Sequence, residues 1–164
     1  MLQLLAFGVV VALTSGPRLG ADDPKPAAED AAKTELEKLQ GGWTCVGYEK
    51  GGERHISKEA RAEMKNETLL IRGDRVSSSW ETGGKGGGFG WRIKLHPTRQ
   101  PKGIDLTWEA GIEENLGKTQ RGVYEVEGNE LKICRGEIGA KERPNTLKTK
   151  KGDKRTVRIY EKQK

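Results

Sequence analysis

Short runs in which apolar and polar residues alternate fill most of the chain after residue 42. A period of two is typical of strands with one buried face, and glycine, asparagine and aspartate mark the turns between the runs. Gly128-Asn129, for example, predicts a tight hairpin turn. The pattern predicts strands at residues 43–48, 68–72, 75–81, 89–95, 103–108, 118–126, 130–134, 145–150 and 156–161.

Two segments carry helix-forming residues instead. Residues 27–40 are rich in alanine, glutamate and lysine and end at Gly41-Gly42, and residues 57–66 form the second segment. Most strands are joined by short connections, which favours antiparallel neighbours, and closure into a barrel hides the sheet edges. We therefore predict an all-β fold, an antiparallel meander closed into a small barrel of eight or nine strands, with a short N-terminal helix.

The same alternation predicts which side chains face the interior. Val157 and Ile159 share a face of the last strand, which places Arg158 on the opposite face. Cys45 falls on an inward face and Cys134 on an outward one, so we expect two free thiols, although export would favour a disulfide. The predicted core comprises Trp43, Cys45, Gly47, Leu70, Val76, Trp91, Ile93, Leu106, Tyr124, Val126, Leu131, Ile133, Leu147, Val157 and Ile159.

The first residues predict the compartment. Residues 2–13 form an apolar run of the length of a signal-peptide core, too short for the roughly 20 residues that span a bilayer. Leu19-Gly20-Ala21 offers a cleavage site, so we predict a signal peptide at 1–21, a linker with the start of the helix at 22–35, and the barrel domain at 36–164. The protein would then be periplasmic or extracellular. The alternative is that the apolar run is a buried strand or helix.

Basic residues are concentrated at the C-terminal end. The chain has a net charge of +6, and residues 141–164 contain ten basic and three acidic residues. Such a segment favours an anionic partner, and for an exported protein we expect an envelope polymer rather than nucleic acid. The alternative is a charged edge strand that resists aggregation. The candidate patch comprises Lys148, Lys150, Lys151, Lys154 and Arg155.

The motif search favours no enzymatic class. The Gly-rich stretch at 83–88 does not fit a dinucleotide-binding fingerprint, and we interpret it as a flexible hairpin at the barrel mouth. His55 and His96 lie in expected loops without metal-ligand spacing. Asp105 and Glu125 are expected to face outward, and no nucleophile elbow occurs. We therefore predict no catalytic residues, no cofactor and no metal site.

Four ordered segments resemble a lipocalin-like domain that is abundant in planctomycete bacteria. They are LQGGW at 39–43, KGIDLTW at 102–108, GKTQRGVYEVEGNELKIC at 117–134 and KERPNTLKTKKG at 141–152. The resemblance covers about residues 36–162 and implies a calycin-type β-barrel, often behind a signal peptide, with no established activity or ligand. In true lipocalins a tryptophan such as Trp43 plugs the closed end under a late-strand arginine. Arg158 is the nearest candidate for that arginine, although alternation places it opposite Val157 and Ile159.

Aromatic residues are the candidates for a binding cavity. Core packing explains each of them equally well, because an eight-stranded barrel is either filled by side chains or holds one small ligand. We predict a monomeric binding or interaction module for a small apolar ligand, and the alternative is a ligand-free structural or inhibitory barrel. The candidate lining residues are Trp43, Trp80, Trp91, Trp108 and Tyr124.

Overall fold

A computed structural model describes residues 25–152 and 155–164, so the expected signal peptide lies outside the described residues. The helices are α1 (Lys25–Leu39) and α2 (Lys58–Glu63), with a 3-10 turn, η1 (Glu113–Asn115). The strands are β1 (Gly41–Lys50), β2 (Glu53–His55), β3 (Thr68–Arg72), β4 (Arg75–Thr82), β5 (Lys85–His96), β6 (Gly103–Ala110), β7 (Thr119–Glu127), β8 (Glu130–Ile138) and β9 (Val157–Lys162).

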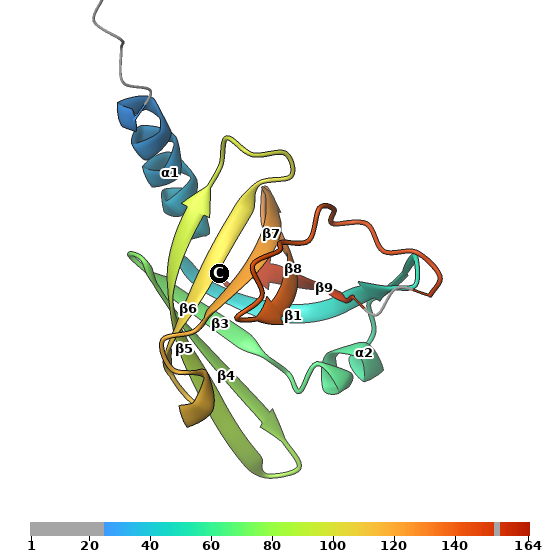
Figure 1. Ribbon diagram of the computed structural model, residues 1–164. Coiled ribbons are helices and arrows are strands. Elements are labelled where there is room, and N and C mark those ends of the chain that lie inside the picture. The colour runs from blue at the N-terminus through green and yellow to red at the C-terminus, as the bar shows by residue number, and fades with distance from the viewer. Residues whose placement is uncertain (1–24, 153–154) are drawn as a thin grey trace, which may run out of the picture.

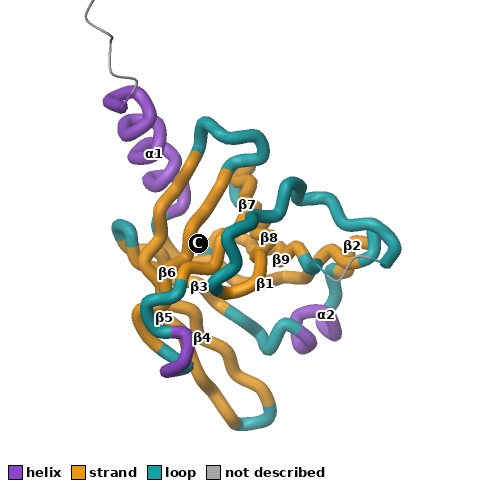
Figure 2. Tube along the Cα trace, viewed as in Figure 1, coloured by secondary structure: helices purple, strands orange, loops and turns teal. Residues whose placement is uncertain are grey.

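Eight antiparallel strands close into a barrel, as the sequence predicts (Figures 1 and 2). Strands β1 and β3 to β9 follow one another in order, and β1 pairs with β9 to close the sheet. The remaining strand, β2, is not part of the closed barrel. It pairs only with the C-terminal end of β1, where Tyr48 lies opposite His55. Helix α1 stands at one end of the barrel (Figure 1).

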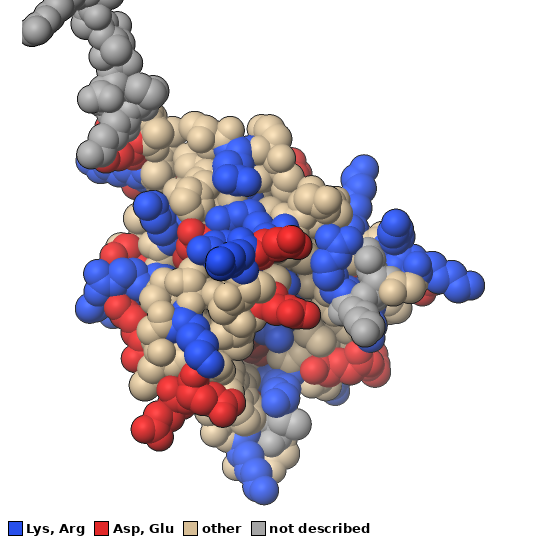
Figure 3. All heavy atoms as spheres, in the orientation of Figure 1, with Lys and Arg blue, Asp and Glu red and all other residues tan. Residues whose placement is uncertain are grey.

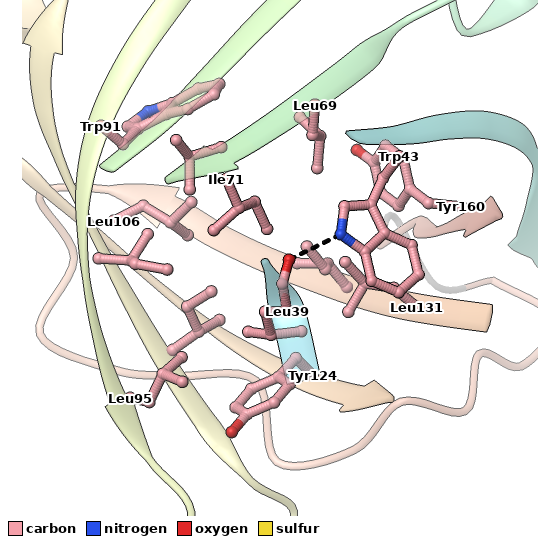
Figure 4. Packing of buried hydrophobic residues seen from close by; sticks show 14 of the residues in the cluster. Leu39, Trp43, Leu69, Ile71, Trp91, Leu95, Leu106, Tyr124, Leu131 and Tyr160 are labelled. Carbon is pink, nitrogen blue, oxygen red and sulfur yellow. Dashed lines mark hydrogen bonds between the residues drawn. The ribbon is translucent and has the colours of Figure 1, made fainter. Parts of the chain in front are cut away.

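The end of the barrel next to α1 is filled by large side chains (Figure 4). Leu39, the last residue of α1, and Trp43 of β1 are both almost completely buried, and the Trp43 indole N–H donates to the Leu39 carbonyl at 2.8 Å. Glu35 of α1 accepts hydrogen bonds from Lys102 at 2.9 Å and from the Tyr124 hydroxyl at 3.3 Å. These contacts hold α1 on the barrel, and we call this the closed end.

Most of the predicted core is confirmed, but the last strand is turned the other way. Tyr160 belongs to the main interior cluster, so Arg158 also faces inward, and Val157 and Ile159 face outward. Val157 packs outside the barrel with Val123 and Cys134. The connection between β8 and β9 contributes Leu147 to this outer cluster. Both faces of β9 are therefore buried, and alternation alone could not identify the inner one.

Two further core predictions are wrong for local reasons. Leu70 is exposed, whereas its neighbours Leu69 and Ile71 are buried. Three successive apolar residues fit either face of a strand, so the alternation did not show which of them faces inward. Gly47 follows a β-bulge in β1 and does not point into the core. A Cβ at Gly47 would lie 2.0 Å from the His55 carbonyl oxygen. Glycine at this position therefore allows the end of β2 to lie directly against the backbone of β1.

The strand predicted at 145–150 is absent, and residues 139–152 form an irregular connection across the outside of the barrel. Specific polar contacts fix its path. Arg143 donates to the Ile104 carbonyl at 2.8 Å, and the Thr149 N–H donates to Glu49 at 2.9 Å. The segment has alternating residues because one side lies against the barrel, not because it joins the sheet.

The Gly-rich stretch forms a hairpin, as expected. Strands β4 and β5 meet at Gly83 and Gly84, which both have positive φ, and the hairpin extends beyond the end of the barrel opposite α1 (Figure 1). The Trp80 ring lies across Gly87, where a Cβ would approach within 2.6 Å of the ring. A side chain at Gly87 would displace Trp80 from this position.

Cys45 and Cys134 are not joined by a disulfide, which confirms that prediction. Cys45 belongs to the interior cluster and Cys134 to the outer one, so the wall of the barrel separates the two side chains.

Candidate ligand-binding site

The end of the barrel opposite α1 contains a hollow of about 720 Å³. Strands β5, β6, β7, β8 and β9 and the connection between β8 and β9 all contribute to its wall. We call this the open end. The wall comprises Phe89, Trp91, Trp108, Gln120, Ile133, Arg135, Gly136, Glu137, Ala140, Glu142, Arg143, Pro144, Arg155, Thr156 and Arg158.

Three aromatic rings form one side of the hollow. Trp91 and Trp108 lie edge to face with their centroids 5.1 Å apart, and Phe89 lies 5.2 Å from Trp108 and 5.8 Å from Trp91. Edge-to-face contacts of this kind hold rings in defined orientations. Both tryptophans are at least nine-tenths buried, whereas Phe89 is half-buried. The cluster therefore presents a preformed apolar surface with Phe89 at its accessible side.

A charged cluster lies beside the aromatic rings. The Glu67 carboxylate accepts from Arg135 at 3.2 Å, from Ser78 at 3.0 Å, from Tyr160 at 3.2 Å and from Arg158. Its side chain is 5% exposed, against 15% for Arg135 and 35% for Arg158. Burial raises the pKa of the Glu67 carboxyl, but the two guanidinium groups outweigh burial and hold it below its ordinary value. Glu67 is therefore ionised at neutral pH.

Three buried N–H groups around the hollow have no hydrogen-bond partner among the described residues. They are Nε1 of Trp91, Nε1 of Trp108 and Nε of Arg135, and all three residues contribute to the wall of the hollow. Arg135 also stacks over Trp91, with its Cζ 5.0 Å from the ring centroid. Unpaired donors are rare in protein interiors, so their concentration around one hollow distinguishes this region.

The structure divides the five aromatic candidates among three locations. Trp91 and Trp108 line the hollow. Trp43 and Tyr124 fill the closed end, where each has a hydrogen-bond partner. Trp80 lies on the β4–β5 hairpin with the Lys65 ammonium 4.6 Å from its ring centroid, and it does not line the hollow.

The basic candidates are divided as well. Lys148, Lys150 and Lys151 are exposed on the connection, Arg155 lines the hollow, and Lys154 lies outside the described residues. Figure 3 shows basic side chains gathered on the right of the molecule, where the connection lies beside the β1–β2 hairpin, with acidic side chains among them. The Gly52 N–H donates to Thr149 at 2.9 Å and joins the two segments.

Asp105, on the outer face of β6, binds Arg143 of the connection between β8 and β9. It accepts from Arg143 at 2.6 Å and from His96 at 2.8 Å. Burial raises the pKa of the Asp105 carboxyl, but the hydrogen bonds from His96 and Arg143 lower it by more than burial raises it. The pKa of Asp105 is therefore below its ordinary value. Of the two histidines expected in solvent, His96 is therefore hydrogen-bonded to a carboxylate. His55 is half-buried, and its ring stacks on Tyr48 at 4.8 Å.

Sequence reasoning missed Glu67, Arg135 and Arg158 as residues of the open end. The three interact directly, although they come from the segment before β3, from β8 and from β9. Within residues 25–152 and 155–164, no group of three His, Cys, Asp or Glu side chains has the arrangement of a metal site.

No protein-family model and no curated protein matches the chain. None of the described helices has the length and apolar character needed to cross a bilayer.

Proposed function

We propose that this protein is an exported, lipocalin-like binding protein that takes a small and largely apolar molecule into the open end of its barrel. The hollow beside Phe89, Trp91 and Trp108 is the observation that carries the proposal. Its volume of about 720 Å³ lies within the roughly 300–1,000 Å³ that is typical of small-molecule pockets.

The division of the barrel into two ends supports this function. The closed end is occupied by the chain's own side chains, which gives the strands a rigid base. The open end combines an aromatic wall with polar side chains, four of them arginines, so it offers an apolar surface together with polar groups that can orient a ligand. A ligand would enter beside Phe89, the accessible member of the aromatic cluster.

Titration with a neutral fluorescent probe, N-phenyl-1-naphthylamine, tests the proposal. We expect saturable binding of one probe per chain, together with quenching of tryptophan emission. Phe89→Ala should weaken binding about tenfold, because it removes one wall of the aromatic cluster. Leu70→Ala is the control, since Leu70 is an exposed apolar residue of β3 that does not line the hollow. Absence of saturable binding would instead support a ligand-free structural or inhibitory barrel.

Export is the second part of the proposal, and it depends on the apolar run at 2–13 and on Leu19-Gly20-Ala21. Expression in a secreting host followed by N-terminal sequencing should give a mature chain that begins near Asp22. Recovery of the protein with Met1 intact would contradict export while leaving the binding function open to its own test.

A further inference from the structure

The unpaired groups around the hollow indicate what its ligand must supply. Among the described residues, all buried side-chain nitrogen and oxygen atoms without a partner belong to Trp91, Trp108 and Arg135, and each is an N–H donor. A buried donor without an acceptor destabilises a protein by roughly 1–3 kcal/mol. Since every missing partner is an acceptor, the complementary ligand carries acceptor atoms.

The charges around Glu67 lead to the same conclusion. Arg135 and Arg158 both contact the single carboxylate of Glu67, so an enclosed guanidinium and a part-exposed one share one negative charge. Arg143, also in the wall, is paired with Asp105 at 2.6 Å. The acidic wall residues Glu137 and Glu142 are exposed to solvent. Among the described residues, the cluster of Glu67, Arg135 and Arg158 therefore carries one positive charge in excess, and Arg158 presents it to the hollow.

The way in which Glu67 is bound shows that this cluster recognises carboxylates. Two guanidinium groups and the Tyr160 and Ser78 hydroxyls converge on it, and charge-assisted contacts of this kind are among the strongest hydrogen bonds in proteins. Arg158 is the most exposed charged member of the cluster and lines the hollow. An anion entering the hollow would therefore meet Arg158 first.

We propose that the ligand is a monoanionic amphiphile, a molecule with an apolar body and one carboxylate or similar oxyanion. Its body lies against Phe89, Trp91 and Trp108, and its anionic group binds at Arg158 and Arg135. One negative charge balances the excess guanidinium, and the oxygens of the anionic group are acceptors, the kind of partner that the unpaired donors lack. This inference rests on the proposed function, because it assigns the ligand class of the same hollow.

A pair of probes with the same aromatic body isolates the charge. N-phenyl-1-naphthylamine is neutral, and 1-anilinonaphthalene-8-sulfonate adds one sulfonate to the same rings. We expect the sulfonate probe to bind about tenfold more tightly to the purified protein, and only its affinity should fall with added salt. 1-Naphthoate should displace it, and the neutral 1-naphthalenemethanol should displace it less well, if carboxylates share the site.

Substitutions locate the anionic group. Arg158→Gln should weaken the sulfonate probe about tenfold and leave the neutral probe unchanged, and the part-exposed position of Arg158 favours retention of the fold. Glu67→Gln should have the opposite effect and tighten the sulfonate probe, because it removes the carboxylate that occupies the arginines. Arg72→Gln is the control, since Arg72 is exposed at the far end of β3.

The outcomes separate the two proposals. If the neutral probe binds at one site but the sulfonate adds no affinity, or if Arg158→Gln affects both probes equally, the ligand is not an anion and the proposed function stands. If neither probe binds, the proposed function fails and this inference fails with it. Circular dichroism and thermal unfolding of each variant confirm that the barrel is retained.

Discussion

The two ends of the barrel contain similar residues in different surroundings. At each end a buried glutamate accepts hydrogen bonds from a tyrosine hydroxyl and two basic side chains. At the closed end the glutamate is Glu35, and its partners Lys38 and Lys102 have side chains 53% and 33% exposed. At the open end the glutamate is Glu67, and its partners Arg135 and Arg158 have side chains 15% and 35% exposed. Arg135 is therefore more enclosed than either lysine of the closed end, whereas Arg158 is about as exposed as Lys102.

The tryptophans show the same contrast. The Trp43 N–H at the closed end donates to a carbonyl, whereas the Trp91 and Trp108 N–H groups at the open end have no partner among the described residues. A structural end satisfies its own polar groups, and a binding end leaves groups that a ligand completes. This difference, rather than the barrel fold, is the basis for assigning the site, because the same fold serves many functions.

The largest expected effect tests whether the closed end is the structural one. Trp43→Ala should lower the free energy of unfolding by about 3–5 kcal/mol, because it opens a cavity in a filled core and leaves the Leu39 carbonyl without its donor. Phe89→Ala should cost about 1 kcal/mol, since its ring is half-buried. Urea unfolding of both variants measures the difference, and equal losses would contradict the distinction between the ends.

The two glutamates provide the next test. Glu67→Gln should lower the free energy of unfolding by about 3 kcal/mol, because it leaves the enclosed guanidinium of Arg135 and the part-exposed one of Arg158 without a carboxylate. Glu35→Gln should cost about 1 kcal/mol, since its lysine partners reach water. Paired denaturant curves at neutral pH compare the two. A Glu35→Gln variant as unstable as Glu67→Gln would show that both clusters are equally enclosed.

The pH dependence of stability sharpens this comparison. The pKa of Glu67 lies below its ordinary value of 4.5, because Arg135 and Arg158 outweigh the effect of burial. A lowered pKa in the folded state means that ionised Glu67 stabilises the fold fully above that ordinary value. This contribution is lost as the pH falls through the lower folded value. The free energy of unfolding should therefore decrease as the pH falls below about 4.5.

Glu67→Gln should make that decrease shallower, because the substituted side chain does not titrate. Glu35, whose pKa is also lowered, remains in the variant, so part of the dependence should persist. Urea midpoints measured across the same pH range test this expectation. Superimposable pH profiles for the variant and the parent would show that Glu67 does not contribute.

The barrel could be predicted from the sequence because its strands alternate regularly and its turns carry glycine and asparagine. The charged cluster was missed because Glu67 and Arg135 both lie just outside the predicted strands. Glu67 precedes the strand predicted at 68–72, which has the bounds of β3, yet it continues the inward face of Leu69 and Ile71. Arg135 follows the predicted end at Cys134, although β8 continues to Ile138 and Arg135 occupies the next inward position after Leu131 and Ile133.

The orientation of β9 required tertiary information. Leu147 of the connection packs against the outer face of that strand, and Val157 is completely buried outside the barrel. Period-two alternation identifies two faces but does not say which one is inside when both are covered. The residue type of Arg158 favoured solvent, and only its position beside Glu67 explains why it faces inward.

The smallest expected effect concerns the cations that lie over tryptophan rings at the two ends. Lys162 of β9 lies over Trp43, with its Nζ 5.3 Å from the ring centroid, so Lys162 and not Arg158 is the late-strand cation nearest the closed-end tryptophan. Lys162→Met keeps most of the aliphatic stem and removes the charge. Because the ammonium reaches water, we expect a loss of only about 0.5 kcal/mol and no change in the affinity of either probe. Lys164→Met, two residues further along, is the control and should be neutral.

At the open end, the guanidinium over Trp91 belongs to Arg135, which also binds Glu67, so its removal would affect stability and anion affinity together. A change in probe affinity on Lys162→Met would mean that the closed end takes part in binding, and the assignment of separate roles to the two ends would then be wrong.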